Sequence, residues 1–159
     1  MAIYRLYRNI EASYVEFIEA SLSTATPPWT GITVGKGFPQ DYKGKVPFIG
    51  VEVLENRPQK LEVGSKTSIK NITVKIRIIA SDDGQRLDLA NWLEDLLEDN
   101  DINYYSYTIT NGVVSGKVLT GKIVIRDWFD NRKELTNTEN LEKEDKYRHL
   151  FSFEVNVAI

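Results

Sequence analysis

The sequence contains no cysteine and only one histidine. The absence of cysteine excludes disulfide bridges, thiolate metal sites and thiol nucleophiles, and it agrees with a reducing compartment. A single histidine, His149, excludes a multi-histidine metal site. Because His149 stands in the alternating pattern near the end of the chain, we expect it to be packed or at an interface rather than catalytic.

Long apolar runs are also absent. None approaches the roughly 18 residues that a membrane-spanning helix needs. The opening residues MAIYRLYRNIEAS interleave Arg and Glu, whereas a signal peptide would be continuously apolar. We therefore expect a protein made in the cytoplasm, with no membrane partner. The net charge of −3 lacks the excess of Lys and Arg that phosphate backbones attract, so nucleic-acid binding is not expected.

What is present fits one folded domain. The chain has 159 residues, of which 42% are hydrophobic and 27% charged, which is ordinary for a globular protein. Domains commonly span roughly 100–200 residues. We therefore predict a single domain over residues 1–159.

The first predicted element is an amphipathic helix over residues 3–24. Apolar residues recur there at three- and four-residue spacings, with charged residues between them. The helix is expected to end in SLSTATPP, because the residue before Pro27 is disfavoured in helical geometry. A long polar loop over residues 25–45 follows, interrupted by a short extended piece at 32–35, and a second extended piece is predicted at 46–54.

A strand followed by a helix is the clearest signal in the chain. Apolar residues alternate from Ile72 to Ile78, which predicts a strand with one buried face. Asp82 and Asp83 can then accept hydrogen bonds from the first N–H groups of a helix, so we interpret them as a cap rather than a metal site. Leu93 and Leu96 of this helix are expected to cover the preceding strand.

Strands dominate the rest of the sequence. Residues 104–110 and 118–128 alternate in strand fashion around Asn111-Gly112, a good turn signal, and predict an antiparallel hairpin. The chain closes with a further strand at 151–159. The predicted fold class is therefore α+β, with two helices packed on a mainly antiparallel sheet.

Two polar segments carry aromatic groups that an assembly protein could use. The first is the loop at 25–45, and the second is a charged insertion at 130–146, expected to order as an arm against a neighbouring subunit. Exposed aromatic and arginine residues are typical anchors of protein interfaces. The candidate interface residues are Trp29, Phe38, Trp128, Phe129 and Arg132.

The residues offer little for catalysis. Glu144-Asp145-Lys146 has the carboxylate–lysine spacing of some metal-dependent nucleases, but it lacks an upstream Asp at a strand end. Residues 35–37 and 64–67 match only fragments of a phosphate-binding loop, and turns are the simpler interpretation. We therefore expect no catalytic residue, no cofactor and no metal, and a nuclease is kept as a weak alternative.

The middle of the chain combines a Glu62-Val63-Gly64 turn before a strand, a strand ending in Ile79-Ala80-Ser81, and a short polar joint with Gln85 that opens a Leu-rich helix. In these features it resembles the tail-terminator and tail-completion proteins of long-tailed bacteriophages. The charged insertion at 130–146 departs from the family pattern. No role can be carried over to that segment.

The resemblance implies a structural protein of the virion tail or neck. It implies a homohexameric ring that caps the tail tube protein, meets the head–tail connector proteins, and lets DNA pass through its lumen without sequence-specific binding. Another neck, connector or baseplate component with a similar small fold is the alternative within the same class. Whether the purified protein closes into rings distinguishes the two.

Overall fold

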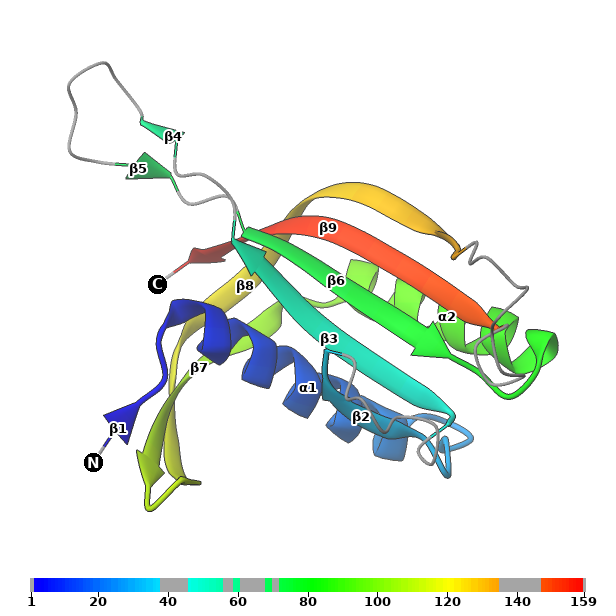
Figure 1. Ribbon diagram of the computed structural model, residues 1–159, viewed down its shortest axis with the longest axis horizontal. Coiled ribbons are helices and arrows are strands. Elements are labelled where there is room, and N and C mark those ends of the chain that lie inside the picture. The colour runs from blue at the N-terminus through cyan, green and yellow to red at the C-terminus, as the bar shows by residue number, and fades with distance from the viewer. Residues whose placement is uncertain are drawn as a thin grey trace, which may run out of the picture.

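The computed structural model describes residues 2–37, 46–55, 59–60, 68–69, 72–134 and 147–158. These residues form a single α+β domain, in which two helices pack on one face of a curled, mostly antiparallel sheet (Figure 1). The predicted fold class is confirmed. No helix in the described residues is long and apolar enough to cross a membrane.

The main sheet has the strand order β1-β7-β8-β9-β6-β3-β2, and β2 and β3 are its parallel pair. Two further strands, β4 and β5, pair with each other beyond the ends of β3 and β6 (Figure 1). The strands are β1 (Ala2–Ile3), β2 (Thr33–Lys36), β3 (Phe48–Glu55), β4 (Gln59–Lys60), β5 (Ser68–Ile69), β6 (Ile72–Ile79), β7 (Ile102–Thr110), β8 (Val113–Lys133) and β9 (Arg148–Ala158).

Helix α1 (Leu6–Thr24) buries one apolar stripe against the sheet. Ile10, Tyr14 and Ile18 are fully buried at four-residue spacing, as the sequence pattern predicts. The helix begins three residues later than expected, because Ile3 belongs to β1 and pairs with β7. It ends at Thr24, ahead of the two prolines.

Helix α2 (Asp83–Asp99) begins at the predicted cap. The side chain of Asp82 accepts a hydrogen bond of 2.8 Å from the backbone N–H of Gln85, and the Gln85 side chain accepts one of 2.8 Å from the N–H of Ser81. The expected packing is correct for Leu93, which is fully buried. Leu96 is only partly buried, because it lies at the margin of the apolar stripe.

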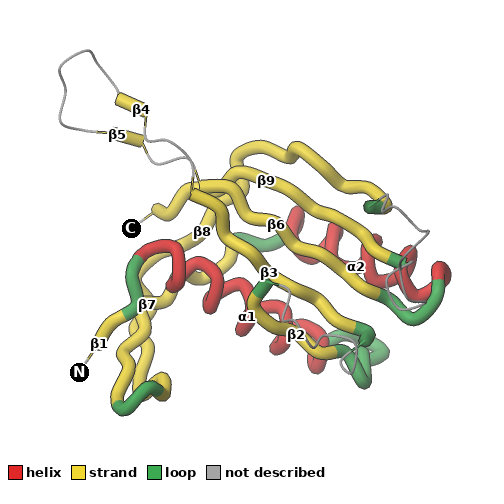
Figure 2. The backbone as a smooth tube through the Cα atoms, in the orientation of Figure 1, coloured by secondary structure: helices red, strands yellow, loops and turns green. Residues whose placement is uncertain are grey.

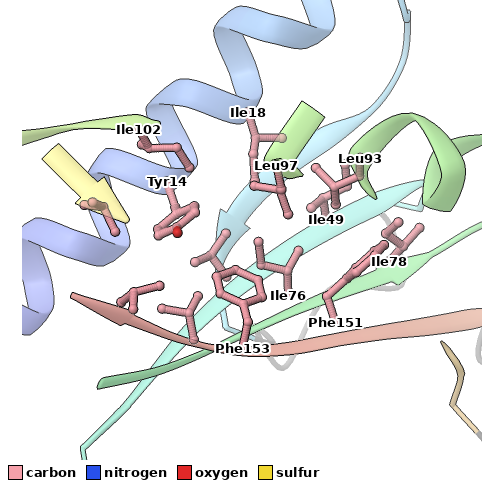
Figure 3. Close-up of a cluster of buried hydrophobic side chains, with 14 of the residues drawn as sticks. Tyr14, Ile18, Ile49, Ile76, Ile78, Leu93, Leu97, Ile102, Phe151 and Phe153 are labelled. Carbon is pink, nitrogen blue, oxygen red and sulfur yellow. The ribbon is translucent and has the colours of Figure 1, made fainter. Parts of the chain in front are cut away.

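The core lies between the helices and the sheet (Figure 3). Tyr14 and Ile18 of α1 and Leu93 of α2 meet side chains of the central strands, including Ile76 and Phe153. The rings of Tyr14 and Phe153 lie 5.8 Å apart at a tilt of 53°. The two helices thus share one core, which fixes both of them to a single rigid sheet.

The strands at the end of the sheet are longer than the sequence predicts. Strand β8 begins at Val113 rather than at 118, and it continues to Lys133. Residues 130–133 of the predicted insertion at 130–146 therefore belong to a strand. They pair with residues 149–152 of β9, which begins at Arg148. Residues 135–146 of the insertion, and residues 38–45 of the first predicted loop, lie outside the described residues.

Candidate subunit interface

Exposed apolar side chains gather on one strand. All but one of the large hydrophobic side chains exposed in the described residues belong to β8, and the exception is Leu87 on α2. Single exposed apolar residues are normal on a protein surface, whereas several on one element indicate a surface that meets a partner. The exposed side chains on β8 are those of Val113, Val114, Val118, Leu119, Val124 and Phe129.

Strand β8 changes partner along its length. Residues 113–123 pair with β7, and residues 122–133 pair with β9 on the other edge. The β7–β8 hairpin therefore extends beyond the end of β9 as an arm (Figure 2). From here on, the word arm means residues 104–121 of this hairpin and not the predicted insertion at 130–146. The arm carries four of the exposed apolar residues, at Val113, Val114, Val118 and Leu119.

The tip of the arm is the predicted turn. Asn111 and Gly112 both adopt positive φ, at 52° and 77°. Two consecutive residues of positive φ give a type I′ turn, whose twist matches that of the strands it connects. An Asn-Gly pair adopts this geometry at little cost, so the sequence fixes the register of the hairpin locally.

A cluster of polar contacts holds the arm to α1. The Tyr107 hydroxyl donates a hydrogen bond of 2.5 Å to Glu16, and the Lys117 ammonium forms an ion pair with the other oxygen of the same carboxylate. Lys117 also lies 4.5 Å from the ring centre of Tyr105. Burial opposes ionisation of Glu16, but the hydrogen bonds from Lys117 and Tyr107 outweigh it and lower the pKa of Glu16.

The outer edge of β7 is closed by side chains of α1. Ser13 accepts a hydrogen bond of 3.1 Å from the backbone N–H of Tyr105, and Asn9 accepts one of 3.3 Å from the N–H of Tyr107. The Asn9 amide in turn donates to the Tyr104 hydroxyl at 3.1 Å. Backbone groups that already have partners cannot recruit a strand from another molecule, so this edge is blocked.

A depression lies where the second half of β8 passes α2. Its volume is ≈ 310 Å³, and its lining combines two aromatic rings with carboxylates and one amide. Phe129 is 51% exposed and stands at an irregularity of the β8–β9 ladder, between Trp128 and Asp130. A bulge of this kind re-aims a side chain out of the sheet. The lining residues are Glu94, Glu98, Trp128, Phe129, Asp130 and Asn131.

The predicted interface residues fall in different environments. Trp128 packs on Phe153 at 4.9 Å between ring centres, so its ring is partly buried against the core. Trp29 packs on Trp92 at 6.0 Å, and both line a groove with Pro27 and Pro28. Both tryptophan rings therefore pack on another aromatic ring of the same subunit.

Of the other candidates, Phe129 lines the same depression as Trp128, whereas Trp29 lines a separate groove. Phe129 is exposed, as an interface residue should be. Arg132 is exposed and forms an ion pair of 3.2 Å with Asp130. Phe38 lies outside the described residues.

His149 is packed, as the sequence predicts. It is 7% exposed, and its Nδ1 accepts a hydrogen bond of 2.9 Å from the guanidinium of Arg86, so its Nε2–H donates to Asn131 at 2.7 Å. Burial, followed by the charge of Arg86, lowers the pKa of His149 to about 4, against a smaller opposing effect of Glu94. The imidazole is neutral near pH 7 and joins α2 to β8 and β9.

The other motifs give no candidate site. In the described part of the chain, no group of three or more His, Asp or Glu side chains is placed to hold a metal ion. Gly35 and Lys36 lie in β2 rather than in a phosphate-binding loop. The Glu144-Asp145-Lys146 triplet and residues 64–67 lie outside the described residues.

Sequence reasoning missed the apolar residues of the arm. The sequence pattern places residues 111–116 in the link between two strands, whereas Val113 and Val114 lie in β8 and are exposed. The available signal was the short distance between the Asn-Gly turn and two β-branched residues, which is typical of a tight hairpin. Glu16 gave no such signal, because Tyr107 and Lys117 are far from it in the sequence.

Comparison with protein-family models finds no match, and a search among curated proteins finds no significant similarity.

Proposed function

We propose that this protein is a structural component of a long-tailed bacteriophage virion, and that it acts as a tail terminator. Subunits form a homohexameric ring on the end of the tail tube. One face of the ring stops polymerisation of the tail tube protein, and the other face meets the head–tail connector proteins. DNA passes through the lumen without being read.

The observation that carries the proposal is the concentration of exposed large apolar side chains on β8, where all but one of those in the described residues lie. An isolated subunit leaves Val113, Val118 and Leu119 in water at exposed fractions of 69%, 66% and 57%. Apolar area is favourable to bury, at roughly 25 cal/mol per Å². A subunit that projects such residues on a defined arm is suited to assemble with other subunits through that arm.

The construction of the arm supports the same function. It is held to α1 through Glu16, and its turn has a single favoured geometry. A projecting element fixed in this way loses little conformational entropy when it meets a partner. The net charge of −3 suits a lumen that DNA crosses without adhering.

The experiment is native mass spectrometry of the purified protein, together with class averages from electron microscopy. We expect a six-subunit species that appears as a closed ring. Added to polymerising tail tube protein, the ring should bind one end of the tubes and stop their growth. A protein that stays monomeric at all concentrations, and that neither binds nor limits the tubes, would contradict the proposal.

A further inference from the structure

Among the described residues, each half of β8 has a neighbouring strand on one edge only. Along residues 113–121, β7 occupies one edge, and no described strand pairs with the other. Along residues 124–133, β9 occupies the opposite edge, and again no described strand lies on the remaining side (Figure 1). We call these the arm edge and the body edge. Because the partner strands lie on opposite sides of β8, the two edges face in opposite directions.

The backbone on the arm edge points outward at Lys117. Tyr107 directs its N–H to Asn9, and its carbonyl accepts a hydrogen bond of 3.1 Å from Tyr4, so both groups point away from β8. Residues opposite each other in an antiparallel ladder share this orientation. Lys117 is opposite Tyr107, and its N–H and C=O therefore point away from β7.

The same argument locates the outward groups of the body edge. The N–H of Glu134 donates a hydrogen bond of 3.0 Å to the carbonyl of Arg148, so residue 134 faces β9. Orientation alternates along a strand, and Lys133 therefore directs its N–H and C=O away from β9. The depression containing Phe129 lies along this half of β8.

The two edges offer complementary groups beside the strands. Residues 102–122 contain two charged residues, both basic, of which Lys117 already pairs with Glu16 and Lys122 is exposed. Residues 124–133 of β8 carry charges of both signs, and Asp130 pairs with Arg132, so the carboxylates in the depression without an ion pair in β8 are Glu94 and Glu98 of α2. The exposed apolar side chains of the arm thus match the aromatic lining of the depression, and Lys122 matches the two carboxylates of α2.

We propose that the arm edge of one subunit pairs with the body edge of a second copy, as an added β-strand. This inference rests on the proposed function and names the contact that builds the ring. The pairing is head-to-tail, because each subunit gives its arm edge on one side and its body edge on the other, and such contacts form a ring when the rotation between subunits closes. Pairing two arm edges with each other would leave both body edges uncovered.

Proline tests each edge separately. Proline removes an outward N–H but is tolerated on an edge whose N–H makes no ladder bond within the chain. Lys117→Pro should weaken subunit association, and so should Lys133→Pro, each by about tenfold or more in Kd. Lys117→Ala and Lys133→Ala are the matched controls. They also remove the ion pairs of Lys117 with Glu16 and of Lys133 with Asp83, but they keep the backbone N–H. Association is measured by analytical ultracentrifugation, and folding by circular dichroism.

Mixing the two proline variants tests the direction of the contact. Lys117→Pro keeps an intact body edge, and Lys133→Pro keeps an intact arm edge. Head-to-tail pairing predicts that a mixture forms a one-to-one heterodimer, while each variant alone is monomeric. If Lys133→Pro associates as the parent does, the arms pair with each other or with another surface, and the inference is wrong. A wild-type protein that forms no oligomer would instead contradict the proposed function.

Cross-linking keeps the inference testable if a proline variant does not fold. The chain has no cysteine, so introduced cysteines are the only thiols. Val118→Cys and Arg132→Cys, mixed and treated with a short bis-maleimide, should give a cross-link between the two variants. Each variant alone should give little cross-link to itself. Cross-linking of Val118→Cys to itself, with none in the mixture, would overturn the head-to-tail arrangement. Rings without either product would overturn the edge pairing alone.

Discussion

Leu93 and Leu87 lie on the same helix in opposite environments. Leu93 is fully buried in the shared core, whereas Leu87 is 53% exposed. We expect Leu93→Ala to reduce the free energy of unfolding by about 2–5 kcal/mol, because it removes apolar contacts and leaves a cavity. Leu96→Ala should cost less, since Leu96 is only partly buried.

Urea unfolding of the three alanine variants measures these differences. Leu87→Ala is the control and should lie within about 0.5 kcal/mol of the parent. Equal losses at positions 87 and 93 would show that α2 does not pack as described.

His149 makes stability depend on pH. Its pKa is about 4 when folded and near 6.5 when unfolded, so below pH 6.5 the unfolded chain binds more protons than the folded one. Stability is therefore complete above about pH 6.5 and falls as the pH decreases toward 4. The loss should be roughly 1–3 kcal/mol for this one group.

The measurement is urea unfolding at pH 7 and pH 5, for the parent and for His149→Gln. Glutamine can accept from Arg86 and donate to Asn131 without titrating, so the variant should lose less stability over this interval. A parent and variant with the same pH dependence would show that folding does not lower the pKa of His149.

At the scale of elements, the arm depends on its attachment to α1. Glu16 receives hydrogen bonds from Tyr107 and Lys117, on both strands of the arm. Glu16→Gln keeps an acceptor for Tyr107 and removes the charge that Lys117 pairs with. We expect a stability loss of about 0.5–1 kcal/mol, because the pair is partly exposed.

Hydrogen exchange should report the same change locally. Amides of the arm are expected to exchange faster in Glu16→Gln, while amides of the central strand β6 remain as protected as in the parent. Glu19→Gln is the control, since residue 19 is exposed on the same helix. Unchanged exchange in the arm would mean that the turn and the β7–β8 ladder alone hold it.

At the scale of the whole molecule, the exposed apolar side chains of the arm should matter for assembly and not for folding. We expect Val113→Ser together with Val118→Ser to leave the midpoint of thermal unfolding of the monomer nearly unchanged, because both residues are more than 60% exposed. Ring formation should weaken by about tenfold or more, which corresponds to roughly 1.4 kcal/mol.

Sedimentation at a series of protein concentrations separates the two effects. Leu87→Ser is the control for a generic loss of exposed apolar surface, since Leu87 is 53% exposed and lies on α2 rather than on the arm. Equal weakening by the control would indicate that assembly does not use the arm.

The sequence by itself determined the local elements. Apolar spacing of four residues predicts α1, and alternation predicts β6. Asp82 marks the start of α2, and Asn111-Gly112 marks the hairpin turn. Each of these signals depends only on neighbours within a few residues. The α+β class follows from the order of these elements. The end of β8 was placed too early, because its polar residues 130–133 become strand only by pairing with β9.

Only the tertiary structure decided which surfaces are available for assembly. The sequence offers Trp128 as an interface candidate, and only the fold shows that its ring is partly buried against Phe153 while it also lines the depression beside Phe129. The closed edge of β7 depends on Asn9 and Ser13, nearly a hundred residues away, and no local pattern encodes that contact. Exposure is a property of what covers a residue, and the covering groups come from distant parts of the chain. For that reason the sequence could give β8 its alternation, while the fold alone decided that, among the described strands, its two halves have neighbours on opposite edges.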